Sequence, residues 1–240
     1  MSHLDLSARW DPFLIYDPRT LLNLYGEEST MVPGLPYTIL WEATEGPTTA
    51  VSWDVELDRT LDFAVEWPVG DWHLVASAGY ESLLRSRRIS DNEDLVRVAR
   101  LDVGAETVSL VVQRAAYHEQ ARSNLILDYR NEGYSRVPTL RQLMAREHGR
   151  MLPSLGDRRL ANTIGVCLLL LFKEEGEPVP YLTYRAPNLG VFPSAIHCSA
   201  GGAVRWSDDL LTRPFLSILS EQIQREMVEE LGISPLEVTD

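Results

Sequence analysis

The chain has 240 residues, of which 45% are hydrophobic and 24% are charged, as in an ordinary globular protein. Its formal net charge of −13 would repel a phosphate backbone, so we expect no nucleic-acid partner. The two cysteines, Cys167 and Cys198, belong to no Cys-x-x-Cys pair, so the sequence indicates neither a zinc framework nor a disulfide scaffold.

No segment has the pattern of a secretory leader or a membrane span. The first residues, MSHLDLSARWDPF, lack a cationic start followed by an apolar run. The longest apolar run, IGVCLLLLF at 164–172, is too short to cross a bilayer and is typical of a strand buried on both faces. We therefore expect a cytoplasmic protein with reduced thiols and no membrane partner.

Residues 1–135 are expected to form a β-rich N-terminal domain of unknown role. Strand-like runs separated by turn-forming clusters lie at 37–43, 50–57, 61–67, 72–78, 95–103 and 107–117. Five of the six tryptophans fall in this part, and clustered tryptophans usually pack in a core or on a sheet face. The more specific alternative is a surface on which nucleic-acid bases stack, but the net negative charge and the lack of lysines between the tryptophans argue against it.

Residues 136–160 are expected to be a linker that contains a short helix. The polar stretch NEGYSRVP at 131–138 contains glycine and proline, which favour a linker. In TLRQLMAREHG, Thr139 is a candidate N-cap and Gly149 is a candidate helix stop.

Residues 161–240 are expected to form strand, turn, strand, loop, strand and helix. The strands are predicted at 164–172, at 181–187 and near the end of 188–206, and the helix at 213–232. Apolar residues recur at every fourth position of this helix, which gives a stripe that must face a sheet: Phe215, Leu219, Ile223, Met227 and Leu231. Gly232 is expected to end the helix in the left-handed conformation.

Three carboxylates, Glu226, Glu229 and Glu230, are predicted to share one flank of the helix beside the apolar stripe. Like charges at this spacing repel, and the C-terminal end of a helix also disfavours anions. Carboxylates clustered on a rigid element bind hard cations through oxygen, so the pattern indicates a divalent cation. The alternative is a solvated charged helix face with no ligand.

The complete string REMVEELGI, at 225–233, resembles the core of the Nudix hydrolase signature. Members of that family cleave a nucleoside diphosphate linked to another group, and they usually use Mg²⁺ or Mn²⁺ bound by this helix. The resemblance implies a metal-dependent pyrophosphohydrolase that acts on a small nucleotide-derived substrate. It also implies an α+β chain in which the β-rich N-terminal domain precedes a Nudix-like α/β/α sandwich.

By matching position, the resemblance makes Glu226, Glu229 and Glu230 metal ligands and one of them the general base. The Gly201 carbonyl would be a further ligand, and Arg225 would orient a glutamate. The remaining residues of the implied site are Arg185, Gly202 and Asp208, as substrate contacts. For Arg185 a surface arginine is the alternative, and for the glycine pair a simple turn or bulge.

The resemblance departs from the family pattern on both sides of the helix. Asp208 stands where the family has glutamate, and about nine additional residues separate it from the helix. Glu221 and Asp209 are both candidates to replace that acid. The chain stops at Asp240, before the further strands and second helix of the family, so the sandwich is expected to be truncated at its C-terminus. A truncated chain, completion by the N-terminal region or by another subunit of a homo-oligomer, and a degenerate binding domain all explain this.

Three functional hypotheses follow. The first is the metal-dependent hydrolase, the second is a catalytically inactive Nudix-like module that binds a nucleotide or a protein, and the third is an accidental match in a structural protein. A nucleophilic cysteine with a histidine base is not expected of His197 and Cys198, because adjacent strand residues point to opposite faces.

Overall fold

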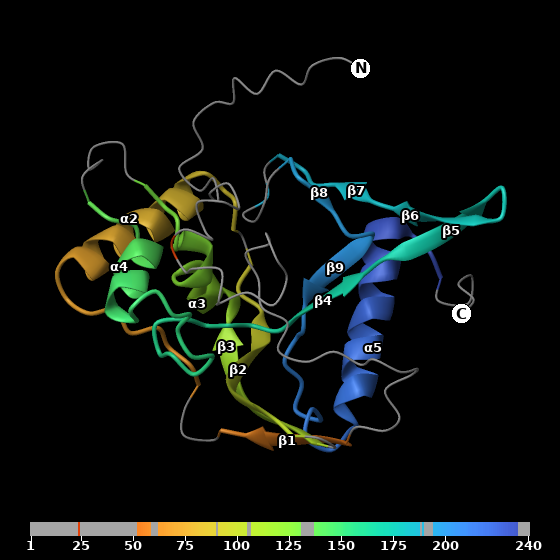
Figure 1. Cartoon of the computed structure of the whole chain (residues 1–240), viewed down its shortest axis with the longest axis horizontal. Coiled ribbons are helices and arrows are strands. Elements are labelled where there is room, and N and C mark those ends of the chain that lie inside the picture. The colour runs from red at the N-terminus through yellow and green to blue at the C-terminus, as the bar shows by residue number, and fades with distance from the viewer. Residues whose placement is uncertain are drawn as a thin grey trace, which may run out of the picture.

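The computed structural model describes residue 24 and residues 52–58, 62–89, 91–104, 107–130, 137–187, 189 and 194–234. Helices and short strands are mixed along these residues, which confirms the α+β class (Figure 1). None of the described helices combines the length and the apolar character that a bilayer crossing requires.

A three-stranded sheet is built from β1 (Ser52–Leu57), β2 (Asp94–Val103) and β3 (Thr107–Ala116), in the order β1-β3-β2. β2 and β3 pair antiparallel, and β1 joins β3 in parallel. The strand predictions at 95–103 and 107–117 are thereby confirmed, and the one at 50–57 is confirmed over its described residues, 52–57. Valine and leucine are frequent in these segments, and they suit a pleated, half-buried surface.

The strand predicted at 72–78 is wrong, because this segment lies in the helix α2 (Asp71–Arg85). Its buried residues, Ala76, Gly79 and Leu83, are three and four apart, so they share one helical face. The strand predicted at 61–67 is reduced to a single bridge between Phe63 and Ala115. The strand predicted at 37–43 lies outside the described residues.

Short helices follow the first sheet and pack against α2. They are α3 (Tyr117–Ala121), a 3-10 turn at Asn124–Ile126, and α4 (Leu140–Glu147). Thr139 and Gln142 form a reciprocal capping box at the start of α4, which confirms the predicted N-cap. A first core cluster joins α2 to α4; its largest fully buried members are Leu83, Ile126, Leu140 and Met144.

Six short strands form three antiparallel pairs in the C-terminal part: β4 with β9, β5 with β6, and β7 with β8. Their bounds are β4 (Gly165–Leu168), β5 (Leu170–Glu174), β6 (Glu177–Tyr181), β7 (Thr183–Tyr184), β8 (Ile196–His197) and β9 (Ala200–Ala203).

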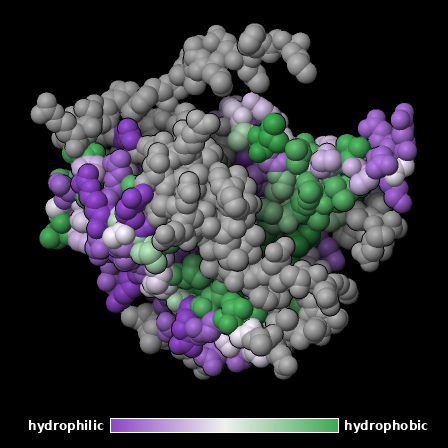
Figure 2. Space-filling model, in the orientation of Figure 1, coloured by the Kyte–Doolittle hydropathy of each residue, from purple (hydrophilic) through white to green (hydrophobic). Residues whose placement is uncertain are grey.

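The single strand predicted at 164–172, buried on both faces, is wrong. The run breaks at Leu169 into β4 and β5, and the side chains of Leu171 and Phe172 are 59% and 52% exposed. β5 pairs only with β6 in an extended hairpin, so no layer among the described elements covers its faces (Figure 1). Figure 2 shows hydrophobic residues gathered over this part of the surface.

The C-terminal helix α5 (Phe215–Glu226) runs into a π-helical turn at Met227–Leu231. Gly232 has a φ of 67°, which confirms the predicted left-handed helix end. The buried face of α5 differs in part from the predicted stripe: Leu219 and Ile223 are only half-buried. Its most buried positions are Phe215, Ile218, Gln222 and Glu226.

The core beneath α5 combines residues from both sides of the boundary expected near 135. Val96 of β2 donates its N–H to the carbonyl of Val204 at 2.9 Å and accepts from the N–H of Ile164 at 2.9 Å. These bonds join β2 to the segments that carry β4 and β9. The second core cluster contains Val96, Leu110, Val112, Val166, Val204, Leu210, Phe215 and Ile218. The N-terminal strands therefore supply cover for α5, one of the alternatives left open by the sequence, while the Nudix-like sandwich stays a prediction.

Candidate functional site

The carboxylate of Glu226 lies directly against the backbone of Gly202. Glu226 belongs to the buried face of α5 and is only 9% exposed. The side-chain amide of Gln222, one helical turn earlier, donates to its Oε1 at 2.5 Å. A Cβ at position 202 would overlap the carboxylate in this position, so any other residue there would make the end of the Glu226 side chain turn away.

The neighbouring Gly201 holds a second glutamate of the motif. Its backbone N–H donates to Oε2 of Glu230 at 3.0 Å. Glu230 lies in the π-helical turn, where hydrogen bonds span five residues instead of four, and such turns are frequent at functional sites. The predicted glycine pair and two of the predicted glutamates are thus adjacent in space.

The third glutamate, Glu229, is exposed and lies beside Arg205, with 3.7 Å between its Oε2 and the guanidinium. Arg205 also pairs with Glu93 at 3.0 Å. The three carboxylates differ in exposure: Glu226 belongs to the buried face of α5, whereas Glu229 and Glu230, in the π-helical turn, are exposed. Among the described residues, these three carboxylates do not form a group with one oxygen each within 4.8 Å.

Burial raises the pKa of Glu226 above its ordinary value. The negative charges of Glu230 and Glu229 raise it further, while the hydrogen bond from Gln222 and the charge of Arg205 act in the opposite direction. The fold therefore holds a carboxylate whose ionised form is disfavoured, and a bound cation would relieve both the desolvation and the repulsion.

An open hollow of about 350 Å³ lies beside this carboxylate. Its polar lining consists of two arginines, the phenol of Tyr117 and four acids: Arg88, Arg205, Tyr117, Asp91, Glu93, Glu226 and Glu229. The acids outnumber the arginines, so the hollow is better suited to a cation, and Arg88 and Arg205 are its groups for contact with an anion. A larger hollow of about 440 Å³ along α2 is mostly apolar in its lining and contains none of the predicted site residues.

Arg185 lies close enough to Tyr117 and His197 for its positive charge to change the pKa of both. Burial raises the pKa of Tyr117, and the positive charge of Arg185 partly offsets that rise. Burial, followed by the same charge, lowers the pKa of His197. Arg185 follows β7, and its backbone N–H donates to the carbonyl of Ala195. The role predicted for Arg185 as a phosphate contact stays a prediction.

Arg225 reaches Glu226 through an intermediate residue. Its guanidinium donates to Oε1 of Gln222 at 3.3 Å, and Gln222 in turn donates to Glu226. Gln222 was not among the predicted site residues, although its position four before Glu226 is the spacing at which helix side chains meet. This relay holds the carboxylate in one orientation.

The acids upstream of α5 lie outside the hollow. Asp208 is exposed. Its negative charge adds to the larger effect of Asp62 in raising the pKa of Arg114 in β3. Asp209 and Glu221, the two candidates to replace the missing acid, both pair with Arg213. None of the three lines the hollow beside Glu226.

A comparison with protein-family models finds no match for this chain, and a comparison with curated proteins finds none either. The functional argument therefore rests on the residues themselves. The resemblance at 225–233 and the contacts of Gly201 and Gly202 with two of its glutamates are the observations that carry it.

Proposed function

We propose that this protein is a Nudix-type hydrolase that cleaves the pyrophosphate bond of a nucleoside diphosphate derivative and depends on Mg²⁺ or Mn²⁺. The single observation that carries the proposal is the seating of Glu226 against Gly202, with Glu230 held by the N–H of Gly201. Glycine supports this seating because a Cβ at position 202 would displace the carboxylate.

The proposed donors are oxygens, the ligand type that a hard divalent cation prefers, and the three carboxylates would have to move closer together to hold one ion. Glu226, Glu229 and Glu230 would hold Mg²⁺ through oxygen, with the Gly201 carbonyl as a further ligand. When bound, the ion would neutralise diphosphate charge and make an attached water more acidic. The raised pKa of Glu226 supports this assignment, because a carboxylate disfavoured by burial and by two like charges is stabilised by a cation.

The protein's own residues would bind and orient the substrate. Arg88 and Arg205 line the hollow beside the glutamates and would attract the negative charge of a diphosphate. Gln222 and Arg225 hold the Glu226 side chain in place. Glu229 is an exposed acid of the hollow, as are Asp91 and Glu93, and as the one within the motif it is the candidate to accept a proton from an attacking water.

The test is a hydrolysis assay with Mg²⁺ or Mn²⁺ and a panel of ADP-ribose, a dinucleotide and a nucleotide sugar. Glu226→Gln and Glu229→Gln are expected to lower turnover by about 100-fold or more, as for the loss of a general base. Glu177→Gln, an exposed glutamate on β6, is the matched control and is expected to leave turnover unchanged. Turnover that survives both glutamine variants would exclude the proposed site.

A second candidate function is a non-catalytic module that binds a nucleotide in the same hollow. The pairing of Glu229 with Arg205 and the separation of the three carboxylates favour it. Absence of turnover on every substrate, with nucleotide binding that Arg205→Met weakens, would support the module over the enzyme.

A further inference from the structure

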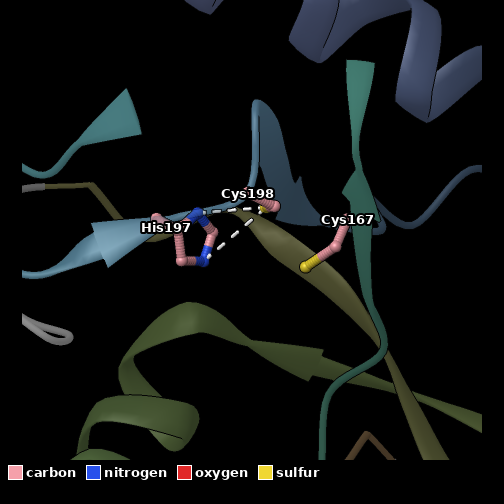
Figure 3. A group of neighbouring side chains, drawn as sticks. All are labelled: Cys167, His197 and Cys198. Carbon is pink, nitrogen blue, oxygen red and sulfur yellow. Dashed lines mark hydrogen bonds between the residues drawn. The ribbon is translucent and has the colours of Figure 1, made fainter. Parts of the chain in front are cut away.

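Three side chains with metal-ligating atoms converge beside the glycine pair. Cys167 comes from β4, His197 from the end of β8, and Cys198 from the residue after it (Figure 3). The two sulfurs and a ring nitrogen all lie within 4.8 Å of one another. Nδ1 of His197 is 3.1 Å from the sulfur of Cys198.

The expectation that His197 and Cys198 point to opposite faces is wrong, because Cys198 lies beyond the end of β8. The chain bends at Ser199 before β9 begins. Ser199 is fully buried, and its hydroxyl donates to the carbonyl of Tyr181 at 2.6 Å and accepts from the N–H of Leu170 at 2.7 Å. These bonds fix the bend that brings the imidazole to the thiol.

Strand pairing brings the second thiol to the same place. In the β4–β9 register Cys167 lies opposite Gly201. A Cβ at Gly201 would lie 3.3 Å from the sulfur of Cys198 and 3.4 Å from that of Cys167, and 2.8 Å from the carbonyl of Val166. Glycine at this position therefore leaves room for both sulfurs on one side of β9.

We propose that Cys167, His197 and Cys198 bind one Zn²⁺ ion through two thiolates and one imidazole, with a fourth position open. Thiolate and imidazole are the ligands that select Zn²⁺ over Mg²⁺, so this site differs in chemistry from the carboxylates of α5. The ligand atoms of a tetrahedral zinc site stand about 3.5–3.8 Å apart. The 3.1 Å between Nδ1 of His197 and the sulfur of Cys198 is shorter than this, so the imidazole has to turn slightly away from the thiol to complete the geometry.

The proposal goes beyond the proposed hydrolase function, because the two cation sites are built from different donors. Glu230 borders both: it accepts from Gly201, and its negative charge acts on His197 and Cys198. Because the donors differ, loss of the cysteine–histidine site would abolish Zn²⁺ binding, whereas loss of the carboxylate site would abolish Mg²⁺ binding, and the two losses can be told apart.

The experiment uses the full chain, freed of metal and kept reduced, with Co²⁺ as a spectroscopic probe and Zn²⁺ as its competitor. We expect one equivalent of Co²⁺ to produce a thiolate-to-metal charge-transfer band, which Zn²⁺ removes and excess Mg²⁺ does not. Cys167→Ser and His197→Gln should each weaken Zn²⁺ binding by about 100-fold or more, since even the loss of a supporting residue costs up to that much.

The controls separate ligation from folding and from the carboxylate site. Cys167 is exposed, so Cys167→Ser is expected to keep the melting temperature of the metal-free protein. His73→Gln, on α2, and Glu226→Gln are expected to leave the charge-transfer band unchanged. The proposal is overturned by a Co²⁺ complex without thiolate absorption, by full competition from Mg²⁺, or by Zn²⁺ affinity that Cys167→Ser does not change. Thiol titration that finds the two cysteines joined as a disulfide in protein isolated without reductant would also overturn it.

Discussion

The carboxylate of Glu226 and the backbone of Gly202 are packed so closely that no side chain fits between them. Glu226 ends the regular part of α5, and Gly202 lies in the middle of β9, so the contact fixes helix against strand. It also holds an acidic group in a half-enclosed position next to the hollow lined by Arg205. Stability and the proposed activity therefore depend on the same contact.

Gly202→Ala is expected to lower the free energy of unfolding by about 1 kcal/mol, because the new methyl group forces the Glu226 carboxylate to turn away from β9. Gly165→Ala is the matched control on the paired strand β4, where a Cβ would meet only the carbonyl of Gly202 at an ordinary 3.6 Å. Urea denaturation of both variants measures the difference. Equal losses in the two variants would contradict the contact.

Glu226→Gln is expected to stabilise the metal-free protein by about 0.5 kcal/mol, because it removes two repulsive pairs, with Glu229 and Glu230. With Mg²⁺ at about 100 times its dissociation constant, the unchanged protein should gain about 2.7 kcal/mol and the variant much less. Thermal melts in chelator and in Mg²⁺ give both comparisons. A variant that gains as much from Mg²⁺ as the unchanged protein would exclude Glu226 as a ligand.

The ion pair between Asp157 and Arg159 is expected to make stability depend on acidic pH. Burial alone would raise the pKa of Asp157, but the hydrogen bonds and charge of Arg159, together with the charge of His148, lower it below 3.8. Because the folded pKa lies below the unfolded one, the contribution is complete above about pH 5 and is lost as the pH falls through the folded pKa.

Asp157→Asn should therefore flatten the loss of stability in acid and lower the free energy of unfolding at pH 7 by about 1–3 kcal/mol. Denaturation curves at a series of pH values test this, with the exposed Asp54→Asn as control. Parallel pH curves for Asp157→Asn and the unchanged protein would show that the pair contributes nothing to acid sensitivity.

The contact of Trp53 with Phe215 tests whether β1 covers α5. The ring centroids are 5.8 Å apart and the planes are tilted by 38°. Phe215→Ala is expected to cost about 3 kcal/mol, and a double-mutant cycle with Trp53→Ala should give a coupling of about 0.5–1.5 kcal/mol. Chemical denaturation of the four proteins supplies the cycle, and strictly additive losses would contradict the packing of β1 on the helix.

Long, strongly periodic segments were predicted correctly from the sequence. The alternating runs at 95–103 and 107–117 form β2 and β3, and the capped run at 139–149 contains α4. The run at 72–78 was mistaken for a strand because seven residues fit both the helical and the strand period, and only packing against α4 selects the helix.

The sequence by itself determined the amphipathic character of the last helix, its end at Gly232, and the presence of three carboxylates near that end. These are local properties, since spacing along one helix follows from its own geometry. Only the tertiary structure decided that Glu226 turns inward onto Gly202 and that Cys167 meets His197 and Cys198. Those contacts join residues far apart in the chain, and they depend on strand register and core packing, which no local pattern specifies.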